Sequence, residues 1–149
     1  MSQVIKSKEE IIEYFEKGSK PKQLWKIGTE HEKFLYDLNT LQPIDYYGKN
    51  GIRSLFKLLK KNGWKEIIED KNPIALKKKE STISLEPRCQ IELSGGKVKT
   101  IHQTCRQAKV YLDQLKTICT KKKIGILGIG YYPKNFKKNT GWVPKKRYS

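Results

Sequence analysis

Apolar residues recur at helical spacing in three segments of the chain. Residues 7–18 begin with a serine followed three positions later by a glutamate, as in a capping box, and end at a glycine. The expected buried side of this first helix consists of Ile11, Ile12, Tyr14 and Phe15. The same periodicity predicts a second helix over residues 51–63 and the longest helix over about residues 97–122. The expected apolar seam of the longest helix consists of Ile101, Cys105, Ala108, Leu112, Leu115 and Cys119.

Stretches rich in β-branched and aromatic residues predict strands between and after these helices. They comprise residues 25–36, 64–70, 73–79, 81–87, 89–94 and 124–133. Residues 82–94 are expected to form a hairpin, and the sequence shows neither an internal repeat nor an interior linker. Helices mixed with strands that read as antiparallel predict an α+β fold, and we expect residues 1–149 to belong to one domain.

The chain is strongly basic, with a formal net charge of +17, and lysine supplies 28 of its 32 basic residues. Proteins that read bases or phosphates specifically usually rely on arginine, whose planar fork bonds bidentately. Lysine spread over every segment is more typical of solvated surfaces, so we do not expect nucleic acid to be the partner. The last 36 residues carry ten basic residues and no acidic one, which keeps a lysine-rich nucleic-acid-binding module as the alternative function.

Membrane and export signals are not expected in this sequence. No apolar run approaches the roughly 20 residues that a membrane-spanning helix needs, and the first ten residues lack an apolar signal core. The three cysteines are odd in number and form no CxxC pair, which favours reduced thiols over a disulfide scaffold. We therefore predict a cytoplasmic protein without a membrane partner.

Four glutamates lie within apolar, strand-like sequence. Glu30 and Glu32 are two apart in "GTEHEKF", so they share one face of the predicted strand, and two like charges placed so repel unless a cation or water screens them. In the predicted hairpin, Glu86 lies at the end of "TISLE" and Glu92 in the middle of "CQIELS", so both are also embedded in apolar sequence. Carboxylates ringing a hard cation such as Mg²⁺ or Mn²⁺ are one interpretation. The other is a wet sheet face whose glutamates pair with lysines.

Six ordered blocks of the sequence resemble one enzyme family. They read "KPKQLWKIGTEHEKF", "STISLEP", "QIELSG", "TIHQTC", "LGIG" and "VPKKRY". Together they are similar to consecutive signature blocks of glutamate–cysteine ligase, the γ-glutamylcysteine synthetase of plants and proteobacteria. The similarity is collinear and covers nearly the whole chain, which makes it more specific than any single block.

The resemblance implies an enzyme that joins the γ-carboxylate of L-glutamate to L-cysteine, the first step of glutathione biosynthesis. It implies ATP and Mg²⁺ as cofactors, a γ-glutamyl phosphate intermediate and no covalent enzyme nucleophile. The implied fold is an antiparallel sheet curved into a funnel with helices outside, as in glutamine synthetase. By similarity, the metal ligands are Glu30, Glu32, Glu86 and Glu92. Arg147 is expected to pair with a carboxylate of the substrate glutamate.

Two departures from the family pattern affect what we expect. Arg88 and Cys89 stand where the family has a Gly-Gly turn, and if that turn needs positive φ, each costs about 1 kcal/mol. Family members are also much longer, so the resemblance implies an N-terminal portion of an incomplete catalytic domain. A complementary C-terminal chain is then a possible partner, and an inactive fragment that needs such a chain is a further alternative.

Overall fold

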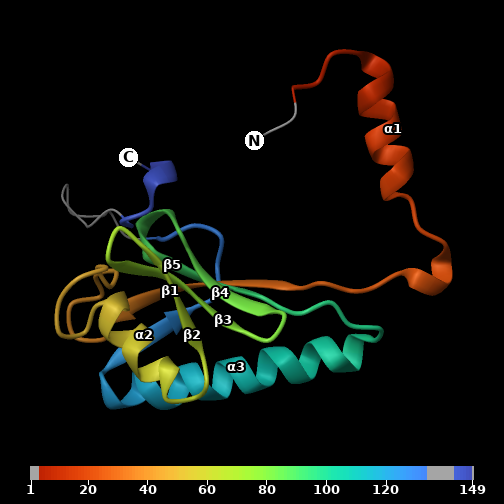
Figure 1. The fold of residues 1–149 in the computed structure, drawn as a ribbon. Helices are drawn as coiled ribbons and strands as arrows, with labels where there is room; N and C mark the ends of the chain where they lie inside the picture. The colour runs from red at the N-terminus through yellow and green to blue at the C-terminus, as the bar shows by residue number, and fades with distance from the viewer. Residues whose placement is uncertain (1–3, 134–142, 149) are drawn as a thin grey trace.

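The computed structural model describes residues 4–133 and 143–148 of the chain. These residues form three helices and six strands, four of the strands following one another between the second and third helices, with short 3₁₀ turns at Lys22–Leu24, Pro87–Cys89 and Lys146–Tyr148 (Figure 1). The helices are α1 (Lys8–Gly18), α2 (Ile52–Lys60) and α3 (Ile101–Lys121). The strands are β1 (Glu30–Asp37), β2 (Lys65–Glu69), β3 (Asn72–Lys78), β4 (Ser81–Glu86), β5 (Gln90–Ser94) and β6 (Ile124–Leu127).

All six strands form one antiparallel sheet in the order β2-β3-β4-β5-β1-β6. Strands β2 to β5 follow one another as a meander, and the β4–β5 pair is the hairpin that the sequence predicted. Strand β1 is first in the sequence but lies beyond β5 in the sheet, where it pairs with β5 on one side and with β6 on the other. The predicted α+β class with an antiparallel sheet and flanking helices is confirmed.

The hydrophobic core lies between one face of the sheet and the helices α2 and α3. The sheet contributes alternate residues such as Ile83, Leu85, Ile91 and Leu93, all at most 2% exposed. Helix α2 contributes the four positions that its periodicity predicted, Ile52, Leu55, Phe56 and Leu59. Because side chains alternate along a strand, the remaining residues of β4 and β5 point to the opposite face of the sheet.

The predicted burial of the first helix is wrong. Ser7 caps α1 as expected, accepting a hydrogen bond from the backbone N–H of Glu10, but no residue of the helix is buried. Ile11 is 42% exposed and Phe15 is 72% exposed. Figure 1 shows α1 standing away from the sheet, so no described element covers its apolar side.

Two other boundaries differ from the sequence prediction. The strand predicted from residue 25 begins at Glu30, and upstream only Ile27 pairs, in an isolated bridge to Val98. Helix α3 begins at Ile101, where Thr100 and Gln103 form a capping box. Its buried side was predicted in part. Leu115 and Cys119 of the expected seam are buried, whereas Ile101 and Cys105 are exposed. The other buried residues of the helix are Thr104, Tyr111 and Ile118. Several helical stripes were apolar enough to fit the pattern, and tertiary packing selects among them.

The turn between β4 and β5 has the backbone that the family's glycines would favour. Arg88 and Cys89 both adopt a φ of 61°, in the left-handed region. The turn therefore has positive φ, the condition under which its two non-glycine residues carry strain. Among the described residues, no helix has the length and apolarity that crossing a bilayer requires.

Candidate functional site

The strand register places all four predicted glutamates on one face of the sheet. Glu32 of β1 lies directly opposite Glu92 of β5, and Glu92 lies opposite Ser84 of β4. Two residues further along β5, Ser94 pairs with Glu30 of β1. Two residues before Glu92 on the same strand, Gln90 pairs with Glu86 of β4. Directly opposed residues share a face, so the carboxylates of three neighbouring strands point away from the core.

The Glu32–Glu92 pair forms the centre of this acidic face. Side chains directly opposite in an antiparallel pair have Cβ atoms roughly 4.5–5.5 Å apart. The Glu92 carboxylate accepts hydrogen bonds from the hydroxyls of Ser84, at 3.2 Å, and Ser94, at 3.0 Å. The Glu32 carboxylate accepts one from the Gln90 amide, at 3.1 Å. These donors are neutral, so they orient the two carboxylates without neutralising their charges.

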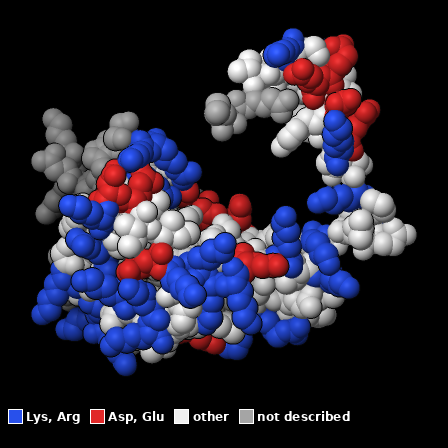
Figure 2. All heavy atoms as spheres, in the orientation of Figure 1, with Lys and Arg blue, Asp and Glu red and all other residues white. Residues whose placement is uncertain are grey.

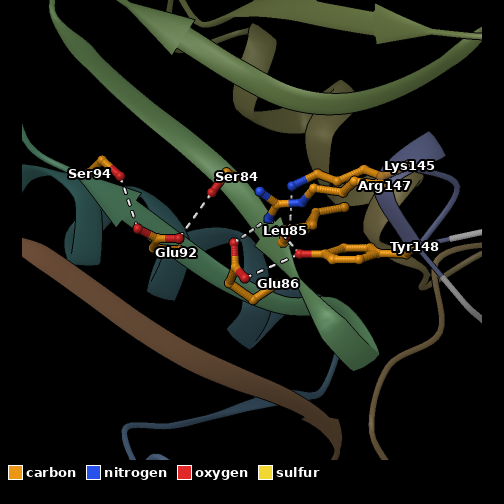
Figure 3. Close-up of polar contacts among 8 residues, drawn as sticks. All are labelled: Ser84, Leu85, Glu86, Glu92, Ser94, Lys145, Arg147 and Tyr148. Carbon is orange, nitrogen blue, oxygen red and sulfur yellow. Dashed lines mark hydrogen bonds and ion pairs between the residues drawn. The ribbon is translucent and has the colours of Figure 1, made fainter. Parts of the chain in front are cut away.

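Glu86 is held differently, by the last described residues of the chain (Figure 3). The Arg147 guanidinium donates to one Glu86 oxygen at 2.9 Å, and the Tyr148 hydroxyl donates to the other at 3.1 Å. Arg147 also donates to the Tyr148 hydroxyl. The arginine predicted to bind a substrate carboxylate is therefore paired with a predicted metal ligand. Sequence reasoning missed this contact because 61 residues separate its two partners.

Lys145 is a buried cation beside this group. It is 8% exposed, its ammonium donates to the Leu85 carbonyl, and it lies near the ring of Tyr148 (Figure 3). Burial lowers the pKa of Lys145, while the nearby carboxylates, Glu86 foremost, oppose that change. In a chain with 28 lysines, no sequence signal distinguishes this one from its solvated neighbours.

Glu30 and Glu32 line one side of an open depression of about 390 Å³. Residues 128–130, which belong to the "LGIG" block, and Lys33 complete the lining. Glu30 lies at the first position of β1 and is exposed. The depression gives a ligand access to the acidic face from the β1 side of the sheet.

The donor set fits a magnesium ion in part. Within residues 4–133 and 143–148, no three His, Cys, Asp or Glu side chains converge closely enough to hold a metal. Magnesium is usually bound by one or two carboxylates together with waters and substrate phosphates, so the Glu32–Glu92 pair suits it. Glu30 is next along the same face, whereas Glu86 would have to leave Arg147. A carboxylate pair of this kind can position a cation against an anionic substrate.

These features define an α+β protein whose antiparallel sheet presents an acidic face on one side and a helix-covered core on the other. The sequence profile of glutamate-cysteine ligase family 2 (GCS2) matches residues 26–149, and the chain belongs to this family. The match begins after α1 and includes all four glutamates and Arg147.

Curated plant proteins show the same relationship. The chain is 43% identical over 143 residues to glutamate–cysteine ligase A, chloroplastic, of Oryza sativa subsp. japonica, an alignment that covers 95% of this chain and 28% of the rice protein. It is 41% identical over 146 residues to glutamate–cysteine ligase, chloroplastic, of Medicago truncatula, with the same coverage. The chain is 40% identical over 146 residues to glutamate–cysteine ligase, chloroplastic, of Arabidopsis thaliana, and this alignment covers 27% of the Arabidopsis protein. The chain thus spans little more than a quarter of the relatives' length.

Proposed function

We propose that the chain is the N-terminal portion of a glutamate–cysteine ligase, acting in glutathione biosynthesis. The reaction would join the γ-carboxylate of L-glutamate to the amine of L-cysteine at the expense of ATP. Family membership over residues 26–149 supports this activity class. The observation that carries the assignment to a site is the direct opposition of Glu32 and Glu92 on neighbouring strands.

The reaction brings several anions together, which the acidic face alone would repel. In the proposed enzyme the glutamate γ-carboxylate takes the terminal phosphoryl group of ATP, ADP leaves, and the cysteine amine then displaces phosphate. Glu32 and Glu92 would hold Mg²⁺, with Glu30 and Glu86 as the further predicted ligands. A bound Mg²⁺ supplies charge neutralisation at the phosphates. Positioning and electrostatics then account for most of the rate enhancement.

Arg147 is the proposed anchor for a carboxylate of the substrate glutamate. Its guanidinium already donates one charge-assisted hydrogen bond to a carboxylate oxygen, that of Glu86, at 2.9 Å, so a carboxylate can bind at this position. In this proposal a substrate carboxylate would replace Glu86 as the partner of Arg147. The released Glu86 would then be available to the metal.

The remaining family sequence would complete the catalytic domain, either within a longer polypeptide or as a complementary chain. A cytoplasmic location remains a prediction. The names of the plant relatives carry the word chloroplastic, which is said of those proteins.

The direct test is a ligase assay with ATP, Mg²⁺, L-glutamate and L-cysteine, in which γ-glutamylcysteine and released phosphate are measured. The 149-residue chain is assayed alone and together with a polypeptide that supplies the remaining family sequence. We expect product from the combination and little from the chain alone. The proposal fails if the combined polypeptides fold and bind each other but release no phosphate in the presence of both amino acids.

The nucleic-acid alternative has its own test, because the charge of +17 would produce salt-dependent binding. Affinity for random duplex DNA is measured from low salt to about 150 mM salt, the physiological range. We expect no binding tighter than about 1 µM at the upper limit, which is the tight end of non-specific binding. Submicromolar affinity there would favour the nucleic-acid-binding module instead.

A further inference from the structure

The N-terminal arm of the chain, residues 4–25, exposes a group of large apolar side chains. Of the seventeen large apolar residues that are exposed in the described part of the chain, eight lie in this short arm. They are Val4, Ile5, Ile11, Ile12, Tyr14, Phe15, Leu24 and Trp25. Single exposed apolar residues are ordinary on a protein surface, whereas a group gathered on one element marks an interaction surface.

Helix α1 presents the apolar residues of this arm on one side. Ile11, Ile12 and Phe15 form its apolar stripe, and Glu9 and Glu13 lie on the opposite side. Figure 2 shows acidic side chains gathered on this helix, while lysine and arginine cover much of the rest of the molecule. An isolated helix shorter than about 12–15 residues is marginal in water, and α1 has 11 residues of which none is buried. The helix therefore depends on a partner that covers its stripe.

Two simple occupants of the stripe fit poorly. The first is α1 of a second copy. An 11-residue helix is about 16 Å long, too short for two such helices to bury the roughly 1,200 Å² of a stable interface. The second is an anionic membrane surface. Helices that lie on such a surface carry lysine and arginine on their polar side, whereas α1 carries Glu9 and Glu13 there.

The plant relatives indicate a third occupant. The alignment to the rice ligase covers 95% of this 149-residue chain, so at most about eight residues lie outside it, and α1 begins at residue 8. Nearly all of α1 is therefore aligned with a protein in which the matched region is 28% of the length. Figure 1 shows α1 and the last described residues on the side of the sheet opposite α3. This is the side of the acidic face, because the core lies between the sheet and α3.

We propose that the apolar stripe of α1 docks onto the remaining family sequence, the part of a glutamate–cysteine ligase that this chain does not span. The recognised surface is an apolar groove, since Glu9 and Glu13 point away from the stripe. The arm holds that polypeptide on the acidic side of the sheet, so that the glutamates become enclosed between the two. The inference takes the identity of the partner from the proposed function, but it does not depend on catalysis.

Binding is tested with the part of rice glutamate–cysteine ligase A that lies outside its alignment with this chain. The two polypeptides are co-expressed, and the affinity of the purified complex is measured by sedimentation. Replacing Ile12 and Phe15 together by Ala should weaken it about a hundredfold, roughly tenfold for each large apolar side chain. Alanine is the best helix former, so this loss would not reflect a melted helix. The matched control replaces Ile101 and Val110, which are equally exposed on α3, by Ala and should leave affinity unchanged.

Hydrogen exchange gives a second readout that does not require two separate polypeptides to associate. The amides of α1 should exchange rapidly in the chain alone and about a hundredfold more slowly when the rice sequence is joined after Ser149. Equally fast exchange in the joined protein would overturn the proposal, as would equal affinities of the α1 variant and the α3 control. Self-association of the chain alone that the α1 variant abolishes would also overturn it, by giving the stripe to a second copy. A complex that depends on α1 but lacks ligase activity would contradict only the proposed function.

Discussion

Glu32 and Glu92 face each other directly across the β1–β5 pair, and neither carboxylate forms an ion pair among the described residues. Like charges directly opposite in a sheet are destabilising. The sheet nevertheless orients both groups through hydrogen bonds from Ser84, Ser94 and Gln90. The sheet therefore holds two like charges side by side, an arrangement that a bound cation would stabilise.

Replacing Glu32 by Gln should separate this repulsion from metal binding. The Gln side chain oxygen can still accept the hydrogen bond from Gln90, while the like-charge contact with Glu92 disappears. We expect the metal-free chain to gain about 0.2–1 kcal/mol in free energy of unfolding, the range for cross-strand pairs. Mg²⁺ affinity, measured by calorimetry, should fall at least tenfold. In a completed enzyme, turnover should fall by orders of magnitude.

Glu16→Gln is the matched control for Glu32→Gln, since Glu16 is exposed on α1, away from the acidic face. It makes the same chemical change and should alter neither Mg²⁺ affinity nor turnover. A Glu32→Gln variant that binds Mg²⁺ as tightly as the unchanged chain would remove Glu32 from the metal site.

A second prediction concerns the Glu86–Arg147 pair. Its two residues have different proposed ligands, Mg²⁺ for Glu86 and a substrate carboxylate for Arg147. The side chains are 27% and 58% exposed, so solvent screens the pair. A double-mutant cycle with Glu86→Gln and Arg147→Met should give a small favourable coupling energy in urea unfolding, as for other solvent-exposed ion pairs. If Glu86 is also a metal ligand, Arg147→Met alone should tighten Mg²⁺ binding severalfold by freeing that carboxylate.

Lys146→Met is the control for Arg147→Met, since it removes one positive charge from the same segment. Lys146 approaches Asp70 at 3.5 Å rather than Glu86. Equal effects of the two variants on Mg²⁺ affinity would mean that the affinity depends on the net charge of this segment and not on the release of Glu86.

The sequence predicted the elements whose periodicity and packing coincide. Helix α2 is one example, because its apolar positions form a single stripe and all four are buried. Helix α1 shows the limit, since its pattern is also amphipathic, yet burial depends on a partner element that no local pattern specifies. The start of β1 was misplaced for a related reason: residues 25–29 have strand-like composition, but only Ile27 finds a bridge partner.

The candidate site, too, was predictable only where local sequence determines it. The common face of Glu30 and Glu32 followed from the two-residue period of a strand. Placing Glu92 opposite Glu32 required the register between strands 60 residues apart, which only the complete sheet provides. The contact of Arg147 with Glu86 and the burial of Lys145 depend on where the chain returns after β6.

The strained turn between β4 and β5 gives a third prediction. Arg88 is exposed and has a φ of 61°, a conformation that glycine adopts without a steric penalty. Arg88→Gly should therefore raise the free energy of unfolding by about 0.5–1 kcal/mol, partly offset by the greater freedom of the unfolded chain. Lys116→Gly, within α3, should lower it by about 1 kcal/mol. Destabilisation by Arg88→Gly would show that the arginine side chain contributes more than the strain costs.

The two buried thiols predict how stability changes at alkaline pH. Burial raises the pKa of Cys89 and of Cys119 from an ordinary value of 9.0 to about 12. A group whose pKa is raised in the folded state contributes stability that is complete below the unfolded value and is lost as pH rises through the folded one. Stability should thus fall between pH 9.0 and about 12, by at most about 1.4 kcal/mol per pH unit for each thiol.

Other groups titrate in the same window, so the test compares slopes between variants rather than absolute stabilities. Lys145 acts in the opposite direction, because its lowered pKa means that the unfolded chain binds the extra proton. Cys119→Ala leaves a small cavity, which lowers stability at every pH, but it also removes one titrating thiol. Its urea midpoint should therefore decline less steeply above pH 9 than that of the unchanged chain, with Cys105→Ala, an exposed position, as control. Identical slopes for the unchanged chain and Cys119→Ala would show that this thiol ionises alike in both states, and would contradict its burial as the cause.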